Sequence, residues 1–245
     1  MVKHQRQGFF LFCFIFVFLI FFKCTVFAED TVSHEKDYLD EETITTVADP
    51  LEPWNRLVFQ FNDRLYFWLI KPVARGYSMV VPEDFRHAIS NFFHNITAPV
   101  RVVNCLLQGK IKSAGVEAVS FVLNTTGGVF GFHDFAGKDL KLRVVDDEDL
   151  GQTLGNYGIG NGIYIVWPVL GPSTLRDTLG TIGDGFLDPV NYLELENAIM
   201  VHTIEFTNKT SLHLGEYEDI KASALDPYIA IQDAYIQYRN KKIKK

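Results

Sequence analysis

The chain has 245 residues, of which 23 are Lys or Arg and 30 are Asp or Glu, giving a formal net charge of −7. This acidic balance excludes the basic surface through which proteins usually bind nucleic acid, so no nucleic-acid partner is expected. The chain is long enough to bury one sizeable core, and its three cysteines are too few for a disulfide-built fold.

The first 28 residues have the pattern of a cleaved secretory signal peptide. Lys3 and Arg6 precede an uncharged apolar run from Phe9 to Phe22, and the small residue Ala28 stands at the cleavage position. The apolar run is short for a helix that crosses a bilayer. An uncleaved membrane anchor is the alternative, and in either case the rest of the chain leaves the cytoplasm.

Cleavage would leave a more acidic chain. Removing residues 1–28 takes away three basic residues and no acidic one, which leaves 20 Lys and Arg against 30 Asp and Glu, a charge of −10. Cys105 is then the only cysteine, so no intramolecular disulfide can form. Residues 29–48 are acidic with little apolar content, which is typical of a flexible leader. We expect a helical domain over residues 49–239 and a basic tail over residues 240–245.

The first predicted helix of this domain begins at Pro53 and ends at Pro72. Its apolar residues recur at spacings of three and four, at Trp54, Leu57, Val58, Phe61, Leu65, Trp68 and Leu69. Further apolar residues, Phe59, Tyr66, Phe67 and Ile70, lie outside that stripe, so the apolar arc is wider than one core contact requires. Either other protein elements cover both sides of the helix, or one side touches lipid.

Three more helices are predicted in the next segment, over Glu83 to Ile96, Pro99 to Gln108 and Ser113 to Leu123. Residues 124–137 follow as a loop that combines four glycines with large apolar side chains. Such a loop indicates either close backbone packing or contact with an apolar medium, and the sequence does not choose between them.

The remaining segment is rich in glycine and then helical. In residues 150–171 the spaced glycines lead into a strand-like run and not into a helix, so a turn or hairpin is favoured over a phosphate-binding loop. A helix is expected from Asn191 to about Thr207, and Asp226-Pro227 starts the last one. We interpret the basic cluster at the end as a solvated tail, formed by Arg239, Lys241, Lys242, Lys244 and Lys245.

Patterns typical of enzymes and metal sites are missing from the sequence. Ser173 follows Gly171-Pro172 but lacks the second glycine of a nucleophile elbow two places on, and no zinc-ligand spacing occurs. The acidic run Asp146 to Asp149 lacks the spacing of a calcium loop, so it is interpreted as a solvated turn or helix start. No enzymatic activity, cofactor or metal is expected; a lipid hydrolase would need a catalytic residue that the sequence does not nominate.

Several motifs, taken in order, resemble the MlaA/VacJ family. They run from the opening helix to the last one: Asp49-Pro50-Leu51-Glu52, Trp54-Asn55-Arg56, Phe59 through Asn62, Lys71-Pro72-Val73-Ala74, Val81-Pro82, Asn91-Phe92, Pro99, Asn104, Leu107-Gln108-Gly109, Leu123-Asn124-Thr125, Gly128, Gly131-Phe132, Asp134, Ala136, Asp149 through Gly158, Pro168, Gly171 through Asp177, and Asp226-Pro227-Tyr228-Ile229. The resemblance spans about Asp49 to Tyr238, nearly all of the mature chain.

The resemblance implies a mainly α fold, a ring-like assembly of amphipathic helices with Gly-rich loops and one short β-hairpin, lying in the periplasmic leaflet of the outer membrane. It also implies a function in intermembrane phospholipid transport, in which phospholipids mislocalised in the outer leaflet reach the periplasm through a channel, so that lipid asymmetry of the cell envelope is maintained. The implied partners are phospholipids, a trimeric outer-membrane porin and a periplasmic lipid-carrier protein. A porin-associated scaffold that transports no lipid is the alternative.

On this resemblance we assign candidate residues to the wall of the lipid channel. They are Asn55, Arg56, Phe59, Gln60, Phe61 and Asn62 of the first helix, and Asn156 and Tyr157 of the glycine-rich segment. Asn and Arg near a helix start also serve as caps or ion-pair residues, which is the plainer interpretation. In one respect the chain departs from the family, whose members are mostly lipoproteins. Cys24 follows Phe21-Phe22-Lys23 and not small residues, so we expect no lipidation.

Overall fold

The computed structural model describes residues 49–142 and 147–244. The predicted signal peptide, residues 1–28, and the predicted leader, residues 29–48, lie outside the described residues, as does Cys24. The described part consists mainly of helices and includes one two-stranded sheet, which confirms the predicted mainly α fold. The α-helices are α2 (Glu52–Leu65), α3 (Lys71–Val80), α4 (Glu83–Ile96), α5 (Ala98–Leu107), α6 (Ile111–Thr126), α7 (Leu150–Asn156), α8 (Leu175–Asp184), α9 (Leu195–Leu212), α10 (Glu216–Ser223) and α11 (Pro227–Ile243).

The first helix does not end at Pro72, and this prediction was wrong. A π-helical turn, η1 (Tyr66–Ile70), joins α2 directly to α3, in which Pro72 occupies the first turn. The N–H of Lys71 donates to the carbonyl of Tyr66, five residues back. This wider turn gives room for a proline ring that would clash in a regular α-helix. α3 ends at Val80, and the next residue, Val81, has the extended backbone that a following proline favours.

The helices predicted after Pro82 are confirmed with small changes of boundary. α4 covers the predicted residues, α5 begins one residue earlier than Pro99, and Gly109 turns the chain after α5 with a φ of 72°. α6 continues to Thr126, beyond the predicted end at Leu123. The hairpin of α5 and α6 packs on α4 and α7.

The apolar loop after α6 shows close backbone packing and also exposes apolar side chains. Its backbone packs closely, since a Cβ on Gly131 would lie 2.5 Å from the Cβ of Asn95, and Asn124 accepts a hydrogen bond from the N–H of Ala136 at 2.8 Å. At the same time Val129 and Phe130 are exposed. The segment η2 (Phe135–Asp139), a further π-helical turn, follows this loop.

The glycine-rich segment forms a helix and then a hairpin. α7 occupies its first part. A helix start was one interpretation of the acidic run before it, and Asp149 at the end of that run caps α7 by accepting a hydrogen bond from the N–H of Gln152 at 2.9 Å. β1 (Tyr164–Trp167) then pairs antiparallel with β2 (Gly171–Thr174), with Tyr164 opposite Thr174. The predicted hairpin is therefore confirmed, with a strand beginning later than the glycines.

The C-terminal helices correct two expectations. The helix expected from Asn191 is preceded by a 3₁₀ turn, η3 (Pro189–Tyr192), and begins as α9 at Leu195. α11 starts where predicted, capped by Asp226, but continues to Ile243 through the residues expected to form a tail. Arg239 is buried on α11, so the interpretation of this residue as part of a solvated tail was wrong. Its ion pairs with two carboxylates explain the burial.

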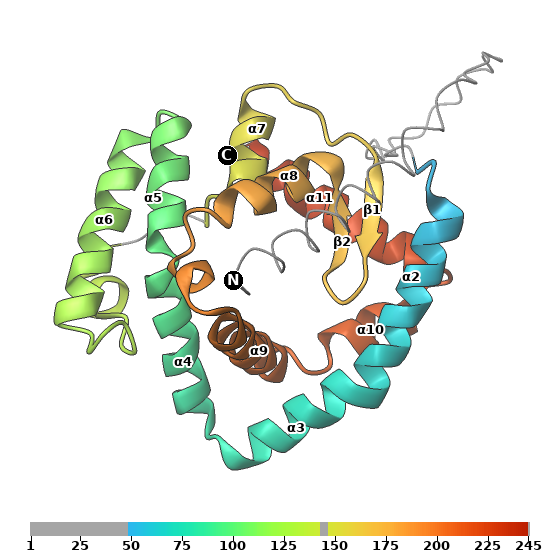
Figure 1. The fold of residues 1–245 in the computed structure, drawn as a ribbon, viewed down its shortest axis with the longest axis horizontal. Helices are drawn as coiled ribbons and strands as arrows, with labels where there is room; N and C mark the ends of the chain where they lie inside the picture. Colours follow the sequence, from blue (N-terminus) through green and yellow to red (C-terminus); the bar gives the residue numbers. More distant parts are fainter. Residues whose placement is uncertain (1–48, 143–146, 245) are drawn as a thin grey trace, which may run out of the picture. The chain divides into compact units, whose positions relative to one another are not determined.

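Within residues 49–244, the helices follow one another around α9 and the β-hairpin (Figure 1). α9 packs along α3 and α4, β1 packs on α2, and α11 returns along α10, β2 and α7. The apolar core is small and lies where the hairpin, α2 and α11 meet. It consists of Val58, Tyr164, Val166, Tyr228 and Ile236, with Phe59 and Tyr235 packed against it.

Candidate functional site

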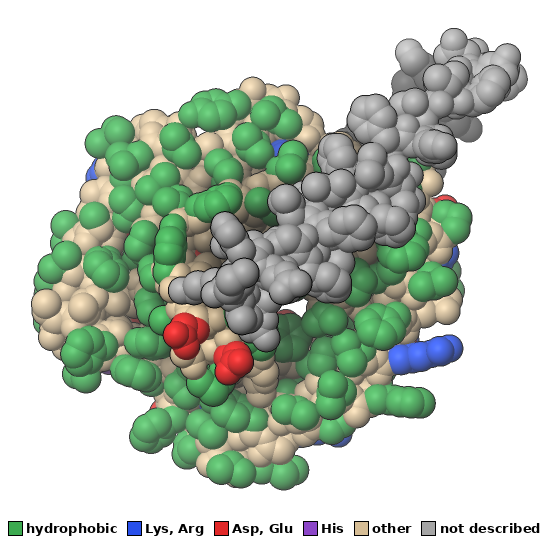
Figure 2. Space-filling model, in the orientation of Figure 1, with side chains coloured by type: hydrophobic (Ala, Val, Ile, Leu, Met, Phe, Trp, Pro, Cys, Tyr) green, Lys and Arg blue, Asp and Glu red, His purple; other side chains and the backbone are tan. Residues whose placement is uncertain are grey.

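Large apolar side chains are exposed along the first helices. Trp68 is 84% exposed, Met79 85% and Val80 82%. Figure 2 shows hydrophobic side chains spread over much of one face, with few charged side chains among them. Within residues 49–142 and 147–244, each helix is either too short or too polar to cross a membrane. Such an apolar surface indicates contact with lipid or with another protein.

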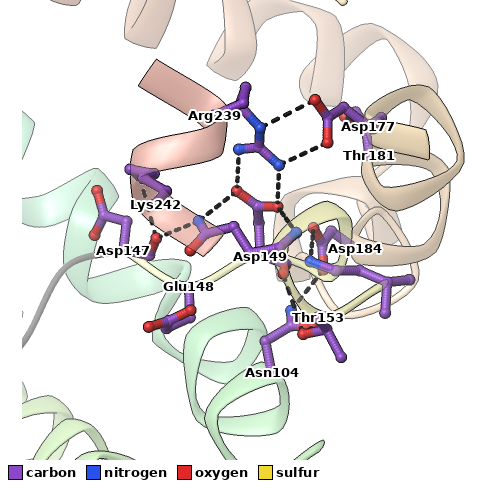
Figure 3. Close-up of polar contacts among 12 residues, drawn as sticks. Asn104, Asp147, Glu148, Asp149, Thr153, Asp177, Thr181, Asp184, Arg239 and Lys242 are labelled. Carbon is purple, nitrogen blue, oxygen red and sulfur yellow. Dashed lines mark hydrogen bonds and ion pairs between the residues drawn. The ribbon is translucent and has the colours of Figure 1, made fainter. Parts of the chain in front are cut away.

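Charged side chains are buried where α7, α8 and α11 meet (Figure 3). The guanidinium of Arg239 donates to Asp149 at 2.7 Å and 2.8 Å and to Asp177 at 2.8 Å and 3.0 Å. Burial would raise the pKa of both carboxyls, but the hydrogen bonds and positive charge of Arg239 hold the pKa of each below its usual value. The network therefore stays ionised and joins three helices.

Further hydrogen bonds extend this network to α5. Asn104 donates to Asp184 at 2.7 Å and accepts from the hydroxyl of Thr153 at 2.9 Å. The backbone N–H of Leu150 donates to the other oxygen of Asp184 at 2.9 Å. Polar contacts thus hold the inner faces of these helices together, which leaves their apolar faces free to point outward. This arrangement is the reverse of that in ordinary soluble domains.

A cavity of about 1390 Å³ lies between the helices and is the candidate functional site. One wall is apolar and comes from the end of α2, from η1, from α3 and from the turn of the β-hairpin; its residues are Leu65, Leu69, Ile70, Val73, Val169 and Leu170. Leu170 is 81% exposed, so the hairpin turn presents an apolar tip to this space. A wall of this kind suits hydrocarbon chains.

The polar part of the lining comes largely from α8, α9 and their connection, where it is interspersed with the apolar Ile199, Phe206 and Leu212. Its polar side chains are Thr181, Asp184, Asp188, Asn191, His202, Thr203, Glu205, Thr207, Asn208, Lys209 and His213. His94, Arg101 and Asp147 are the ionisable lining residues on the side of α4 and α5. Burial and the charge of Arg101 lower the pKa of His94, so its imidazole is neutral at pH 7. The cavity is therefore amphipathic.

The structure places the predicted channel residues away from this lining. Asn55 is fully buried, donates to Asp49 at 2.7 Å and to the carbonyl of Tyr164 at 3.0 Å, and accepts from the N–H of Val166 at 2.8 Å. Asn62 makes two similar bonds to the hairpin turn. Both amides therefore fasten α2 to the hairpin, and only Asn62 does so beside the cavity.

The other predicted residues have different surroundings. Arg56 forms ion pairs with Glu52 at 2.7 Å and with Asp226 at 2.9 Å, and its guanidinium lies over the ring of Tyr228. Phe59 packs on the same ring, whereas Gln60 and Phe61 are exposed on α2.

Asn156 and Tyr157 lie together at the end of α7. Asn156 donates to the side chain of Gln108, and Tyr157 donates to the carbonyl of Leu107, so both residues fasten α7 to the end of α5. The assignment of these residues to the channel wall stays a prediction.

The cavity-lining residues of α9 follow a helical spacing in the sequence. Residues 199, 202, 206, 209 and 213 recur at spacings of three and four and line one face of α9: Ile199, His202, Phe206, Lys209 and His213. Alternating polar and apolar residues on one face give the helix no clear amphipathic pattern, which is why periodicity alone did not single it out.

The described part of the chain is thus a helical protein with an exposed apolar surface, a buried charge network and an amphipathic cavity. The sequence matches the family described as MlaA lipoprotein over residues 47–242. The chain belongs to this family.

Relatives in this family cover most of the chain. The intermembrane phospholipid transport system lipoprotein MlaA of Escherichia coli (strain K12) is 36% identical over 192 residues, which are 78% of this chain and 76% of that protein. The protein of the same name from Haemophilus influenzae is 30% identical over 204 residues, 81% of this chain and 80% of that protein.

A solved structure supports the same conclusion. It comes from a study of the structural basis for maintenance of bacterial outer membrane lipid asymmetry. It matches with a TM-score of 0.72 and 33% identity, and the match covers 80% of this chain and 99% of that one. The overall fold is thus shared with a solved protein.

Proposed function

We propose that the protein is the outer-membrane component of an intermembrane phospholipid transport system, and that it gives phospholipids mislocalised in the outer leaflet a path to the periplasm. The observation that carries this proposal is the cavity whose lining combines an apolar wall with polar and charged side chains. A phospholipid head group cannot cross hydrocarbon without partners, because an unpaired charge there is costly. Polar side chains of α9 offer such partners while the apolar wall accommodates the tails.

The surface of the protein supports a position within one leaflet. Exposed apolar side chains surround the described helices, and none of these helices is suited to cross the bilayer. A protein of this kind rests in the interface, with its apolar side chains in the acyl region. We place it in the periplasmic leaflet of the outer membrane, exported by its signal peptide. We further propose that Cys24 carries no lipid, so that apolar contacts provide the anchoring.

Two protein partners complete the proposal. A trimeric porin would hold the protein in the membrane through part of its exposed apolar surface, and a periplasmic lipid carrier would receive the lipid. The reaction is transport alone, in which no bond is made or broken.

The test is the phospholipid content of the cell surface, measured by head-group labelling of intact cells that lack the gene. Complementation uses the wild type and two matched variants. Thr203→Trp places a bulky ring in the cavity wall, and Thr126→Trp places one at the end of α6, away from the lining. In the wild type, the hydroxyl of each threonine donates to the backbone carbonyl four residues earlier. Both variants therefore lose the same kind of hydrogen bond.

We expect surface phospholipid to rise in the deletion strain and to be restored by the wild type and by Thr126→Trp, but not by Thr203→Trp. No change on deletion would contradict the transport function. If Thr203→Trp restores the surface as well as the wild type does, the porin-associated scaffold becomes the better account.

A further inference from the structure

The charges on the cavity wall are unevenly paired. Among the lining residues, Arg101 is bonded to Glu117 at 3.2 Å, and Asp184 accepts hydrogen bonds from Asn104 and Leu150. Lys209, by contrast, has no ion-pair partner among residues 49–142 and 147–244, and it is exposed to the cavity. An unpaired ammonium group in an amphipathic cavity is a binding group for an anion.

A carboxylate lies one helical turn from this lysine on the same helix. Glu205 also lines the cavity, and within the described part of the chain its one ion-pair contact is with the imidazole of His202 at 3.6 Å, which is charged only when protonated. A separation of four residues corresponds to about 6 Å along the helix axis. Glu205 and Lys209 point a negative and a positive group into the same space without forming an ion pair with each other.

From this arrangement we propose that Glu205 and Lys209 form a subsite for a zwitterionic phosphoethanolamine head group, with the phosphate at Lys209 and the ammonium at Glu205. The inference rests on the proposed transport function and deepens it, because it names the class of lipid. The two charges of phosphoethanolamine are joined by a two-carbon linker, and the long side chains of Lys and Glu can close on that span. Both head-group charges would then be paired inside the cavity.

The rest of the lining favours a zwitterion over a purely anionic head group. Carboxylates outnumber permanent cations in the lining. The carboxylates are Asp147, Asp184, Asp188 and Glu205, and the cations are Arg101 and Lys209. A head group with one negative charge and no ammonium would be attracted by Lys209 but repelled by the carboxylates. An ammonium group turns the contact with Glu205 from repulsive to attractive.

The experiment measures lipid retained by the purified full-length protein in detergent. Equal amounts of phosphatidylethanolamine and phosphatidylglycerol with identical acyl chains are added, and bound lipid is quantified by mass spectrometry. The variants are Lys209→Gln and Glu205→Gln. The matched controls are Lys112→Gln on α6 and Glu196→Gln on α9, both exposed and outside the lining. Thermal unfolding of each variant separates loss of binding from loss of fold.

We expect the wild type to retain phosphatidylethanolamine about tenfold better than phosphatidylglycerol, the ratio expected from one charge-assisted hydrogen bond. Lys209→Gln should lower retention of both lipids, whereas Glu205→Gln should abolish the preference without lowering retention of phosphatidylglycerol. The controls should match the wild type. Equal retention of the two lipids by the wild type, or an unchanged ratio in Glu205→Gln, would overturn the subsite.

A further arm identifies the source of the head group. Soluble glycerophosphoethanolamine should not displace the bound lipid, because it lacks the acyl chains that the apolar wall holds. If it binds as tightly as the lipid, the cavity is a site for soluble phosphate esters and the inference is overturned. Failure to retain either lipid would instead contradict the proposed transport function itself, so the two failures are distinguishable.

Discussion

The Nη2 atom of Arg239 lies 2.8 Å from the Oδ1 atom of Asp177, which joins the last helix to α8 through two almost fully buried side chains. Asp149 completes the contact from the start of α7. Sequence positions 149, 177 and 239 are thereby tied together by one guanidinium. Since the apolar core is small, this buried ion network carries part of the stability that apolar packing supplies elsewhere.

Replacing Arg239 should therefore destabilise the protein strongly. Arg239→Met keeps the aliphatic stem but leaves Asp177 paired with Arg176 alone and removes the ion pair of the partly exposed Asp149. We expect a loss of about 3 kcal/mol in the free energy of unfolding, the lower end of the range for a broken buried ion pair. Urea unfolding of the full chain in detergent measures this value. Lys241→Met, on the exposed side of the same helix, should change it by less than about 0.5 kcal/mol. Similar midpoints for the two variants would show that the network contributes little.

A second charged contact predicts a dependence of stability on pH. Glu218 of α10 pairs with Lys71 at 2.5 Å and accepts from the hydroxyl of Tyr66 at 2.8 Å, which fastens α10 to the π turn η1. Burial alone would raise the pKa of Glu218, but these two contacts lower it from 4.5 to about 2. Because the folded pKa lies below the unfolded one, the stabilisation is complete above about pH 4.5 and disappears as the pH falls to about 2.

Glu218→Gln tests this dependence. We expect the variant to be about 2 kcal/mol less stable than the wild type at pH 7, the usual contribution of a charged hydrogen bond, and to match the wild type near pH 2. Unfolding curves at pH 7, 4 and 2.5 give the difference. Asp219→Asn, at the neighbouring exposed position, should show a small and constant difference. A difference for Glu218→Gln that does not shrink in acid would refute the assigned contact.

Two glycines in helices should respond to alanine in opposite directions. A Cβ on Gly180 of α8 would lie 2.4 Å from the backbone nitrogen of Gly151 in α7, where neither backbone can move independently. Gly180→Ala should therefore cost about 3 kcal/mol. A Cβ on Gly115 of α6 meets nothing within 4 Å, so Gly115→Ala should stabilise the helix by about 0.5–1 kcal/mol. Melting temperatures that shift in the same direction for both would contradict the close packing of α7 on α8.

Local sequence signals were sufficient for some elements of the fold. Pro82 before Glu83, and Asp226 before Pro227, are strong helix starts, and α4 and α11 begin at those positions. They could be predicted because capping and proline geometry depend on neighbouring residues only. The continuation of the helix through Pro72 could not, since it depends on a π turn that forms in the preceding five residues.

The candidate site was harder to predict because periodicity does not say which side of a helix faces lipid. Asn55 has the residue type expected of a polar channel wall, yet its amide is used entirely between α2 and the hairpin. The bonds of Asn55 join residues about 110 positions apart, a relationship that only the fold reveals. Conversely, the cavity wall on α9 mixes His202 and Lys209 with Ile199 and Phe206, so neither polarity nor apolarity marks it.

The hairpin turn offers a test of how Asn62 acts. Its side chain donates to the carbonyl of Trp167 at 2.9 Å and accepts from the N–H of Val169 at 2.8 Å. Val169 has a φ of 70°, a strained backbone for a β-branched residue, and it lines the cavity together with Leu170. A strained turn persists only where its surroundings hold it, and the amide of Asn62 provides that restraint.

Asn62→Ala should therefore release the turn more than it destabilises the domain. We expect a loss of about 1–3 kcal/mol in the free energy of unfolding, and a larger rise in hydrogen exchange at the amide of Val169 than at Val166, whose N–H is held by Asn55. Gln60→Ala, exposed on the same helix, should leave both amides unchanged. If exchange at Val169 is the same in the wild type and in Asn62→Ala, the amide does not restrain the turn. Any effect of Asn62 on transport would then have to come from direct contact with lipid, as the sequence first predicted.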